Sequence, residues 1–315
     1  IDMTESITAE NATQTVVPNE PQQKKLKSKK KFNVIDVIIW VFLGLFSVFC
    51  MLPLLYVVLL SFSTEPDYHI ANFFVIPYHF HFENYKANIL AGFVMQSFGN
   101  TIFLTVVKTI YQMLLTSFGA YAFTRKDVPG IRFFFTLFVI PMFVGGGLLP
   151  FYATVQATTG LNTLWALILP FGLNGFNMIV LRNFFSAVPE EMIESCRLDG
   201  ASDLRILFQF ILPLSGAGLA TIALFYMVDT WNEWYWASMF IRNMELYPLA
   251  FLVRQALHVD GSLDGTWKGA YDASKTYGEG LNAAMTILAL LPILLVYPIL
   301  QKYFTKGVMI GSVKG

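Results

Sequence analysis

One polar segment interrupts the apolar second half of this chain: EEMIESCRLDGASDLRILFQFILP, residues Glu190–Pro213. Its first two residues, Glu190 and Glu191, follow a proline and so fall in a first helical turn, where the positive helix end stabilises carboxylates. Gly200 favours a helix stop, because glycine adopts left-handed backbone angles without strain. Ser202 can cap a second short helix. The segment therefore predicts two short amphipathic helices that meet at a glycine corner.

The residues of this corner leave two interpretations open. An apolar helix face surrounded by acidic side chains suits docking into the groove of a partner protein. The same pattern also suits an ordinary connecting loop whose helix lies on the bilayer surface.

Composition places the chain in a membrane. Its 315 residues are 55% hydrophobic, have a mean hydropathy of +0.56 and include only 13% charged residues, whereas a soluble domain carries roughly twice that charge fraction. The formal net charge is zero, so no basic field indicates nucleic acid. Neither the two cysteines nor the histidines show metal-ligand spacing. No G-x-x-x-x-G-K-[ST] loop occurs, so we expect no nucleotide, cofactor or enzyme active site on this chain.

Hydropathy predicts an all-α, polytopic membrane protein with six transmembrane helices. Residues 1–31 form a basic tail that we expect to be disordered, and residues 32–315 form the transmembrane domain. We expect a break near Pro53 in the first span and an interruption at Gly145–Gly147 in the third. A loop at 186–212 joins the fourth span to the fifth. The spans lie at about 34–62, 98–123, 133–152, 164–185, 211–236 and 281–304.

The distribution of lysine and arginine sets the orientation. With a cytoplasmic N-terminus, 15 of these residues fall on the cytoplasmic side and 5 on the outer side, and Lys108 lies within a span. Because cytoplasmic loops carry the excess of positive charge, both termini and the Glu190–Pro213 segment are expected in the cytoplasm. The outer loop at 238–280 could carry a short helix near Leu249–His258.

Polar side chains inside the spans are candidates for a transport pathway. Asp229 and Glu233 lie among aromatic residues, and carboxylates with aromatic faces are what sugar recognition needs. An interfacial aromatic belt explains the same pattern. Asn174 in the fourth span could line the pathway or form a hydrogen bond between helices. Lys108 could pair with an acid on another span or extend its charge toward an interface. The three glycines at 145–147 could break a helix or allow close helix packing.

The octapeptide ESCRLDGA, Glu194–Ala201, resembles the cytoplasmic "EAA" loop of ABC importer permeases, with Ser195 and Cys196 in place of the two alanines. Trp231–Trp234 resembles the Trp-Asn-Glu-aromatic segment of sugar permeases, and the C-terminal tail is also similar. The resemblance covers about residues 32–315. It is closest to the smaller permease subunit of the maltose importer and leans toward permeases for oligosaccharides from complex polysaccharides or glycans.

The resemblance implies a type I ABC importer permease fold in a bacterial inner membrane. It implies a second homologous permease, so that a heterodimer forms the pathway, two ATPase subunits that bind ATP and Mg²⁺, and an extracytoplasmic sugar-binding protein. The loop at 238–280 would reach that binding protein. The implied ATPase-coupling residues are Glu190, Glu191, Glu194, Ser195, Cys196, Asp199, Gly200 and Ala201. The candidate pathway residues are Asn174, Asp229, Trp231, Asn232, Glu233, Trp234 and Tyr235.

Three alternatives remain from the sequence. An ABC importer permease for a non-sugar solute would show the same loop. An ion-driven secondary transporter would carry an internal repeat, and no clear repeat occurs. A membrane enzyme would need a cluster of catalytic residues, which the sequence lacks.

Overall fold

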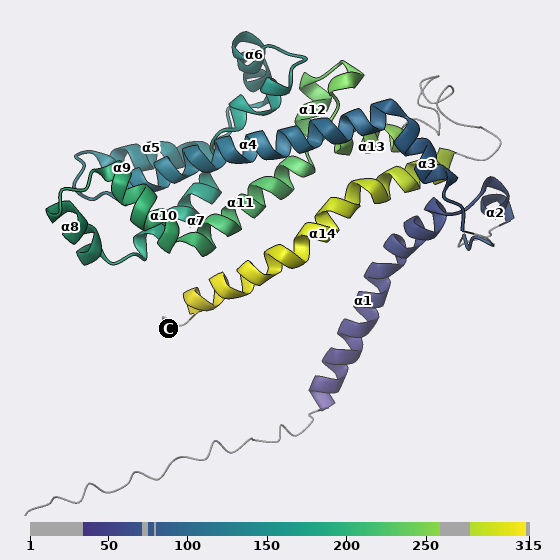
Figure 1. The fold of residues 1–315 in the computed structure, drawn as a ribbon, viewed down its shortest axis with the longest axis horizontal. Helices are drawn as coiled ribbons and strands as arrows, with labels where there is room; N and C mark the ends of the chain where they lie inside the picture. The colour runs from purple at the N-terminus through teal and green to yellow at the C-terminus, as the bar shows by residue number, and fades with distance from the viewer. Residues whose placement is uncertain (1–33, 71–74, 79, 259–277, 313–315) are drawn as a thin grey trace, which may run out of the picture. The chain divides into compact units, whose positions relative to one another are not determined.

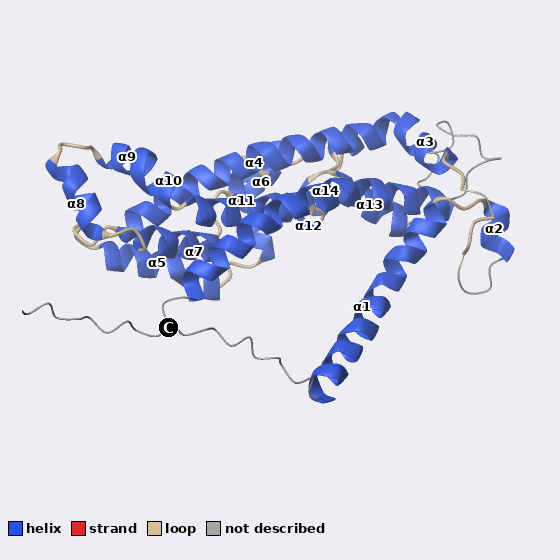
Figure 2. Cartoon of the chain, turned by 60° about the horizontal axis from the view of Figure 1, so that its bottom comes forward, coloured by secondary structure: helices blue, strands red, loops and turns tan. Residues whose placement is uncertain are grey.

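The computed structural model describes residues 34–70, 75–78, 80–258 and 278–312, and every regular element within these ranges is a helix (Figures 1 and 2). The all-α prediction is thereby confirmed. The elements are α1 (Val34–Ser61), α2 (Glu65–Ile70), α3 (Glu83–Leu90), α4 (Gly92–Thr124), α5 (Ile131–Phe143), α6 (Leu148–Thr158), η1 (Leu164–Leu167), η2 (Leu169–Phe171), α7 (Gly175–Ser186), α8 (Glu190–Leu198), α9 (Asp203–Ile206), η3 (Leu207–Ile211), α10 (Leu212–Leu214), α11 (Gly216–Trp231), α12 (Tyr235–Phe240), η4 (Met244–Leu246), α13 (Leu249–His258) and α14 (Gly278–Ser312).

The described chain divides into two units between Cys50 and Met51, and the sites described below lie wholly in the second. α1 runs without interruption from Val34 to Ser61, so the break predicted near Pro53 is wrong. A proline removes one helical hydrogen bond. Neighbouring backbone groups in an apolar medium have no water to pair with, which keeps the rest of the helix intact.

Three described helices, α1, α4 and α14, are long and apolar enough to cross a membrane. Three further pairs of helical segments pass the same test together but are bent: α5 with α6 by 115°, Leu164–Phe171 with α7 by 49°, and Asp203–Leu214 with α11 by 86°. The described chain therefore supplies up to six spans if each bent pair counts as one, in line with the predicted six.

The sharpest bend lies at the glycine run of the third predicted span. Gly147 has φ +84°, and a Cβ at Gly145 or Gly146 would meet nothing within 4 Å. Close packing against the described part of this chain therefore does not explain these glycines. They break the helix between α5 and α6, which was the other interpretation of the run.

The fifth predicted span is wrong at both ends, because no continuous helix covers 211–236. A one-turn π-helix, η3, precedes a bend at Ser215, and α11 ends at Trp231. The chain then turns through Asn232 before α12 begins. Glu233 Oε1 accepts the Trp236 amide N–H at 2.9 Å, so this acid supplies an acceptor for the first turn of α12.

α11 lies at the centre of the second unit, packed against α4, α7 and α14 (Figure 1). One buried cluster, which includes Ala120, Leu181, Phe185 and Ile222, joins α4, α7 and α11. α11 and α7 approach closely at Gly218, where a Cβ would lie 2.5 Å from Phe184 Cγ.

At the other end of the unit, α13 spans Leu249–His258, as predicted for the loop at 238–280. It packs against α4 and α14. The Leu249 amide of α13 donates to Thr101 Oγ1 of α4 at 2.7 Å. Nearby, Asn88 Nδ2 of α3 donates to the Leu281 carbonyl of α14 at 3.0 Å. Residues 259–277 of this loop, and with them its proposed contact with a binding protein, lie outside the described residues.

The close approach at Gly218 gives a stability prediction. Gly218→Ala should lower the free energy of unfolding by about 1–3 kcal/mol. The added methyl group would clash with Phe184 close to that residue's own Cβ, where the side chain cannot move aside freely. Gly216→Ala is the matched control in the same helix, since a Cβ there meets nothing within 4 Å. The unfolding midpoints of the two purified variants in detergent provide the measurement. Equal midpoints would contradict the packing argument.

Candidate functional site

The predicted glycine corner is present between α8 and α9. The Ala201 amide donates to the Cys196 carbonyl at 3.0 Å and the Gly200 amide to the Arg197 carbonyl at 2.9 Å, which is the Schellman pattern. Gly200 has φ +79°. α9 begins at Asp203 without the predicted side-chain cap from Ser202.

One face of the corner packs on the rest of the unit. Cys196 is buried in the same cluster as Ile206 and Leu207, and Ile193 and Ala201 pack against that cluster. Of the two residues that replace the family's alanines, Cys196 thus points into the core and Ser195 is exposed.

A charged network fastens the corner to the end of α4. Arg125 forms ion pairs with Asp127 and Asp203, and its Nη1 also donates to the Tyr121 hydroxyl at 3.3 Å. That hydroxyl donates to Asp203 at 3.3 Å. The hydrogen bonds from Arg125 hold the pKa of Asp127 well below its usual range. Lys126 Nζ pairs with Glu190 at 2.9 Å.

The remaining face of the corner is free of these contacts. Its exposed polar residues are Glu191, Glu194, Ser195, Arg197, Asp199 and Ser202. Two leucine side chains on this face are also exposed to solvent: Leu198 is 89% exposed and Leu204 is 61% exposed. The sequence analysis missed both. The sequence pattern that could have predicted the exposure of Leu198 is that this residue does not share the apolar helix face of Met192, Ile193 and Cys196.

A pocket of about 460 Å³ lies where α4, η2, α7 and α11 meet. Two predicted pathway residues, Asn174 and Asp229, line it together, although 55 positions separate them in the sequence. The other lining residues are Gln112, Phe151, Pro170, Phe171, Leu173, Phe176, Asn177, Phe225 and Tyr226.

Gln112 is the polar lining residue that the sequence analysis missed. It is only 3% exposed, and its Nε2 donates to the Phe171 carbonyl at 2.7 Å. Its Oε1 is buried and has no hydrogen-bond partner among the described residues. The signal was a polar stripe along the apolar helix α4, with Ser97, Thr101, Lys108, Gln112 and Thr116 at intervals of four or seven.

Lys108 and Glu233 form a buried ion pair behind this pocket. Lys108 Nζ lies 3.7 Å from Glu233 Oε2, and the two side chains are 1% and 8% exposed. Lys108 Nζ also lies 4.7 Å from the centre of the Phe171 ring. Of the two interpretations of Lys108, pairing with an acid on another segment is therefore the one that the structure shows.

An aromatic cluster separates this pocket from a second one of about 590 Å³. The Trp236 ring lies 4.9 Å from Phe151, 5.3 Å from Phe171 and 5.5 Å from Phe240, measured between centroids. Phe151 lines both pockets. The second pocket is also lined by Gly146, Gly147, Leu148, Pro150, Thr154, Tyr235 and Trp236.

Three other predicted pathway residues face elsewhere. The Trp231 indole donates to the Ala289 carbonyl of α14 at 3.0 Å, and Asn232 Nδ2 donates to the Val228 carbonyl at 2.8 Å. Trp234 lies under the Arg254 guanidinium at 3.6 Å. The sequence analysis treated these aromatic residues as one group, either for sugar binding or for an interfacial belt. The turn after α11 instead directs them to different partners.

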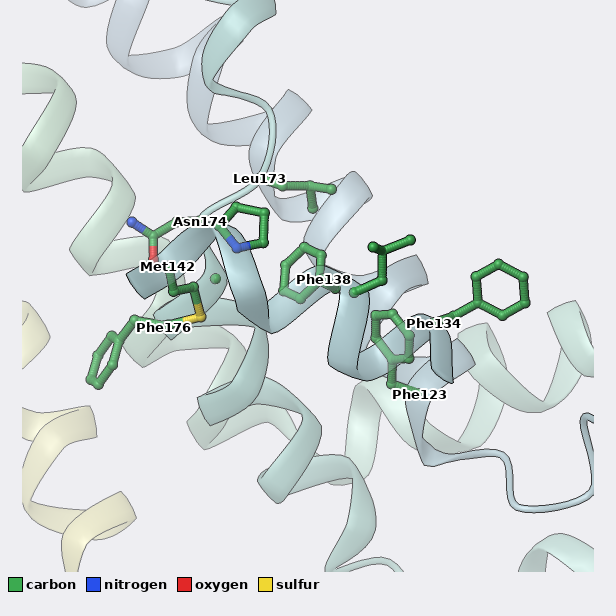
Figure 3. A pocket seen from close by; sticks show the side chains of 10 residues that line it. Phe123, Phe134, Phe138, Met142, Leu173, Asn174 and Phe176 are labelled. Carbon is green, nitrogen blue, oxygen red and sulfur yellow. The ribbon is translucent and has the colours of Figure 1, made fainter. Parts of the chain in front are cut away.

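A third pocket, of about 810 Å³, lies among α4, α5 and α7 and is lined mostly by apolar side chains (Figure 3). Asn174 is the one polar side chain among its ten lining residues. Such a surface cannot satisfy the hydroxyl groups of a polar solute. Within the described ranges, no group of three His, Cys, Asp or Glu side chains could hold a metal ion.

Comparison with known proteins places both the corner and the 460 Å³ pocket in a shared domain. The family described as "Binding-protein-dependent transport system inner membrane component" matches residues 112–310. The chain is 35% identical to the polygalacturonan/rhamnogalacturonan transport system permease protein YtcP of Bacillus subtilis (strain 168), over 90% of this chain and 100% of the relative. It is 37% identical to Protein LplC of the same organism, over 92% of this chain and 98% of the relative.

A solved structure has the same fold. Its title is "Crystal structure of a bacterial ABC transporter involved in the import of the acidic polysaccharide alginate". The match has a TM-score of 0.81 and 28% identity, and it covers 87% of this chain and 99% of the other.

The buried ion pair gives a second stability prediction. Lys108→Met leaves Glu233 as an unpaired charge in an apolar interior, so we expect a loss of about 3–5 kcal/mol in the free energy of unfolding. The double variant Lys108→Met/Glu233→Gln should recover most of that loss, because no lone charge remains. Denaturant unfolding of the two single variants and the double variant measures the coupling.

Lys126→Met is the control, since Lys126 is 81% exposed and its pair with Glu190 is worth roughly 0–1 kcal/mol. A double variant as unstable as the sum of the two single variants would overturn the pairing argument.

Proposed function

We propose a function from a premise that the sequence establishes: this chain belongs to the family of binding-protein-dependent transport system inner membrane components. It is a multi-span membrane permease of an ABC transporter. In our proposal it forms one half of a translocation pathway for carbohydrates, most specifically oligosaccharides, and receives its driving force from a separate ATPase.

The exposed corner carries this proposal. Gly200 sits at the tip with a left-handed backbone, and Leu198 stands bare beside Glu194 and Asp199. Exposed apolar side chains rimmed by acids are typical of a surface that fits a partner groove. Residues Glu190–Ala201 would dock on the ATPase. Cys196 would hold the corner in place by packing into the core. ATP and Mg²⁺ would be held by the ATPase subunits.

Arg125 links the corner to the end of α4. Its ion pairs hold α9 to the end of α4, and α4 also carries Gln112 and Lys108 at the 460 Å³ pocket. At 1.5 Å per residue, Lys108 and Arg125 are roughly 25 Å apart along the helix axis. A push on the corner would therefore reach the pocket through one helix, as alternating access requires.

The pocket itself suits a saccharide. Phe151 and Phe171 offer apolar faces for the C–H groups of a sugar ring, and Asn174 and Asp229 offer hydrogen-bonding groups. The names of a curated relative and of the structural neighbour also refer to polysaccharide-derived solutes.

Partners complete the transporter. We propose a second, homologous permease as heterodimer partner, two ATPase subunits and an extracytoplasmic sugar-binding protein. Both termini would lie in the cytoplasm of a bacterium, because the lysine and arginine excess places them there.

Gly200→Val tests the coupling role. The variant should insert in the membrane but lose most ATP-driven uptake, because valine is strained at φ +79° and adds bulk at the docking tip. Gly160→Val is the matched control, since Gly160 has φ +74° and also has nothing within 4 Å of an added Cβ, but lies in the loop after α6. Uptake of labelled oligosaccharide by reconstituted transporters provides the measurement. Wild-type uptake by Gly200→Val would refute the role, as would equal losses in both variants.

Leu198→Ser separates docking from backbone strain. Leu198 is 89% exposed, so the change should leave the unfolding midpoint unchanged. We expect about tenfold less ATPase subunit to co-purify, since a buried leucine anchor contributes roughly 1.5–3 kcal/mol. Leu149→Ser is the control, because Leu149 is 81% exposed but lies on α6. Undiminished co-purification with Leu198→Ser would remove Leu198 from the interface.

A further inference from the structure

The 460 Å³ pocket carries a carboxylate that has no ion-pair partner among the described residues. Asp229 is exposed at its wall, and among the described residues it accepts no hydrogen bond and forms no ion pair. No Lys, Arg or His occurs among the lining residues of this pocket or of its 590 Å³ neighbour. The surface that this chain offers a solute is therefore anionic.

The nearest cation cannot neutralise Asp229 and a solute at the same time. Lys108 is 1% exposed, is paired with Glu233 and is covered by the Phe171 ring. Lys108 and Glu233 cancel one another, so the group of three ionisable side chains keeps one net negative charge. An anionic solute would have to approach Asp229 without a counter-charge from the described lining residues.

The hydrogen-bonding capacity of the pocket points the same way. Asp229 is exposed at the wall, and an ionised carboxylate only accepts hydrogen bonds. It therefore needs a donor, which a sugar hydroxyl supplies and an ionised solute carboxylate does not.

From these observations we infer that this pocket takes uncharged, hydroxyl-bearing saccharide units and discriminates against units that carry a carboxylate. Asp229 is the residue that determines this specificity. The inference rests on the proposed carbohydrate pathway and narrows its substrate class. It separates this chain from the structural neighbour, whose title names an acidic polysaccharide, and from YtcP, whose name refers to galacturonate-containing polymers.

The expected discrimination is at least about tenfold, because two like charges a few ångströms apart at a partly solvated site repel by more than the equivalent of one power of ten in affinity. Salt should reduce the ratio, since mobile ions screen charges that water can reach.

The test uses the complete reconstituted transporter with a reporter thiol in the pocket. Leu173→Cys, in a chain that also carries Cys50→Ser, places the thiol among the lining residues, and the buried Cys196 is left unchanged. An uncharged maleimide labels the thiol. The measured quantity is the concentration of saccharide that halves the labelling rate. The two probes are a neutral hexose trisaccharide and the trisaccharide with carboxylates at the C6 positions.

We expect the neutral probe to protect at a concentration at least about tenfold lower than the uronate probe. Asp229→Asn should bring the two concentrations within about threefold of one another, since the charge is gone while the amide still accepts hydrogen bonds. Glu245→Gln removes an exposed carboxylate outside both pockets and should leave the ratio unchanged.

The outcomes separate this inference from the proposed function. Equal or better protection by the uronate probe, or a ratio that Asp229→Asn leaves unchanged, overturns the charge inference, while ATP-driven uptake of either sugar upholds the carbohydrate pathway. If neither saccharide protects the thiol and neither is taken up, both proposals fail.

Discussion

A charge inside an apolar protein must be paired, and the pairing of Lys108 with Glu233 organises the centre of this permease. Glu233 uses one carboxylate oxygen for Lys108 and the other for the Trp236 amide. The ion pair thus fixes the turn between α11 and α12 against the middle of α4. Phe171 covers Lys108, and the Trp236 ring packs at a tilt against Phe171, so walls of both pockets depend on one buried interaction.

α4 connects the two regions of interest. Its centre holds Lys108 and Gln112 at the pocket, and its end holds Arg125 at the α8–α9 corner. The two regions use charge differently. Lys108 and Glu233 are almost fully buried, so removing one partner leaves a costly lone charge. The ion pairs of Arg125 and Lys126 involve partly or fully exposed partners, which suits an element that is fastened but reached by water.

Local signals were sufficient where the backbone itself sets the outcome. Gly200 indicated the corner because only a left-handed residue ends α8 there, and the structure gives it φ +79°. Leu249–His258 was predicted as a helix from local pattern alone. The break predicted at Pro53 was wrong, because an apolar environment keeps α1 continuous. The prediction of the fifth span was wrong because η3 and the turn at Asn232 divide an apolar segment that looks continuous in the sequence.

The sequence by itself determined the class of the protein: an all-helical membrane permease with a polar corner between its fourth and fifth spans. These properties follow from hydropathy, charge distribution and short motifs, which are local. Only the tertiary structure decided which polar residues share a site. Asn174 and Asp229 meet with Gln112 in one pocket, whereas Trp231, Asn232 and Trp234 turn to other partners. The physical reason is that side-chain direction depends on helix ends and bends, and those were set by packing between segments far apart in the chain.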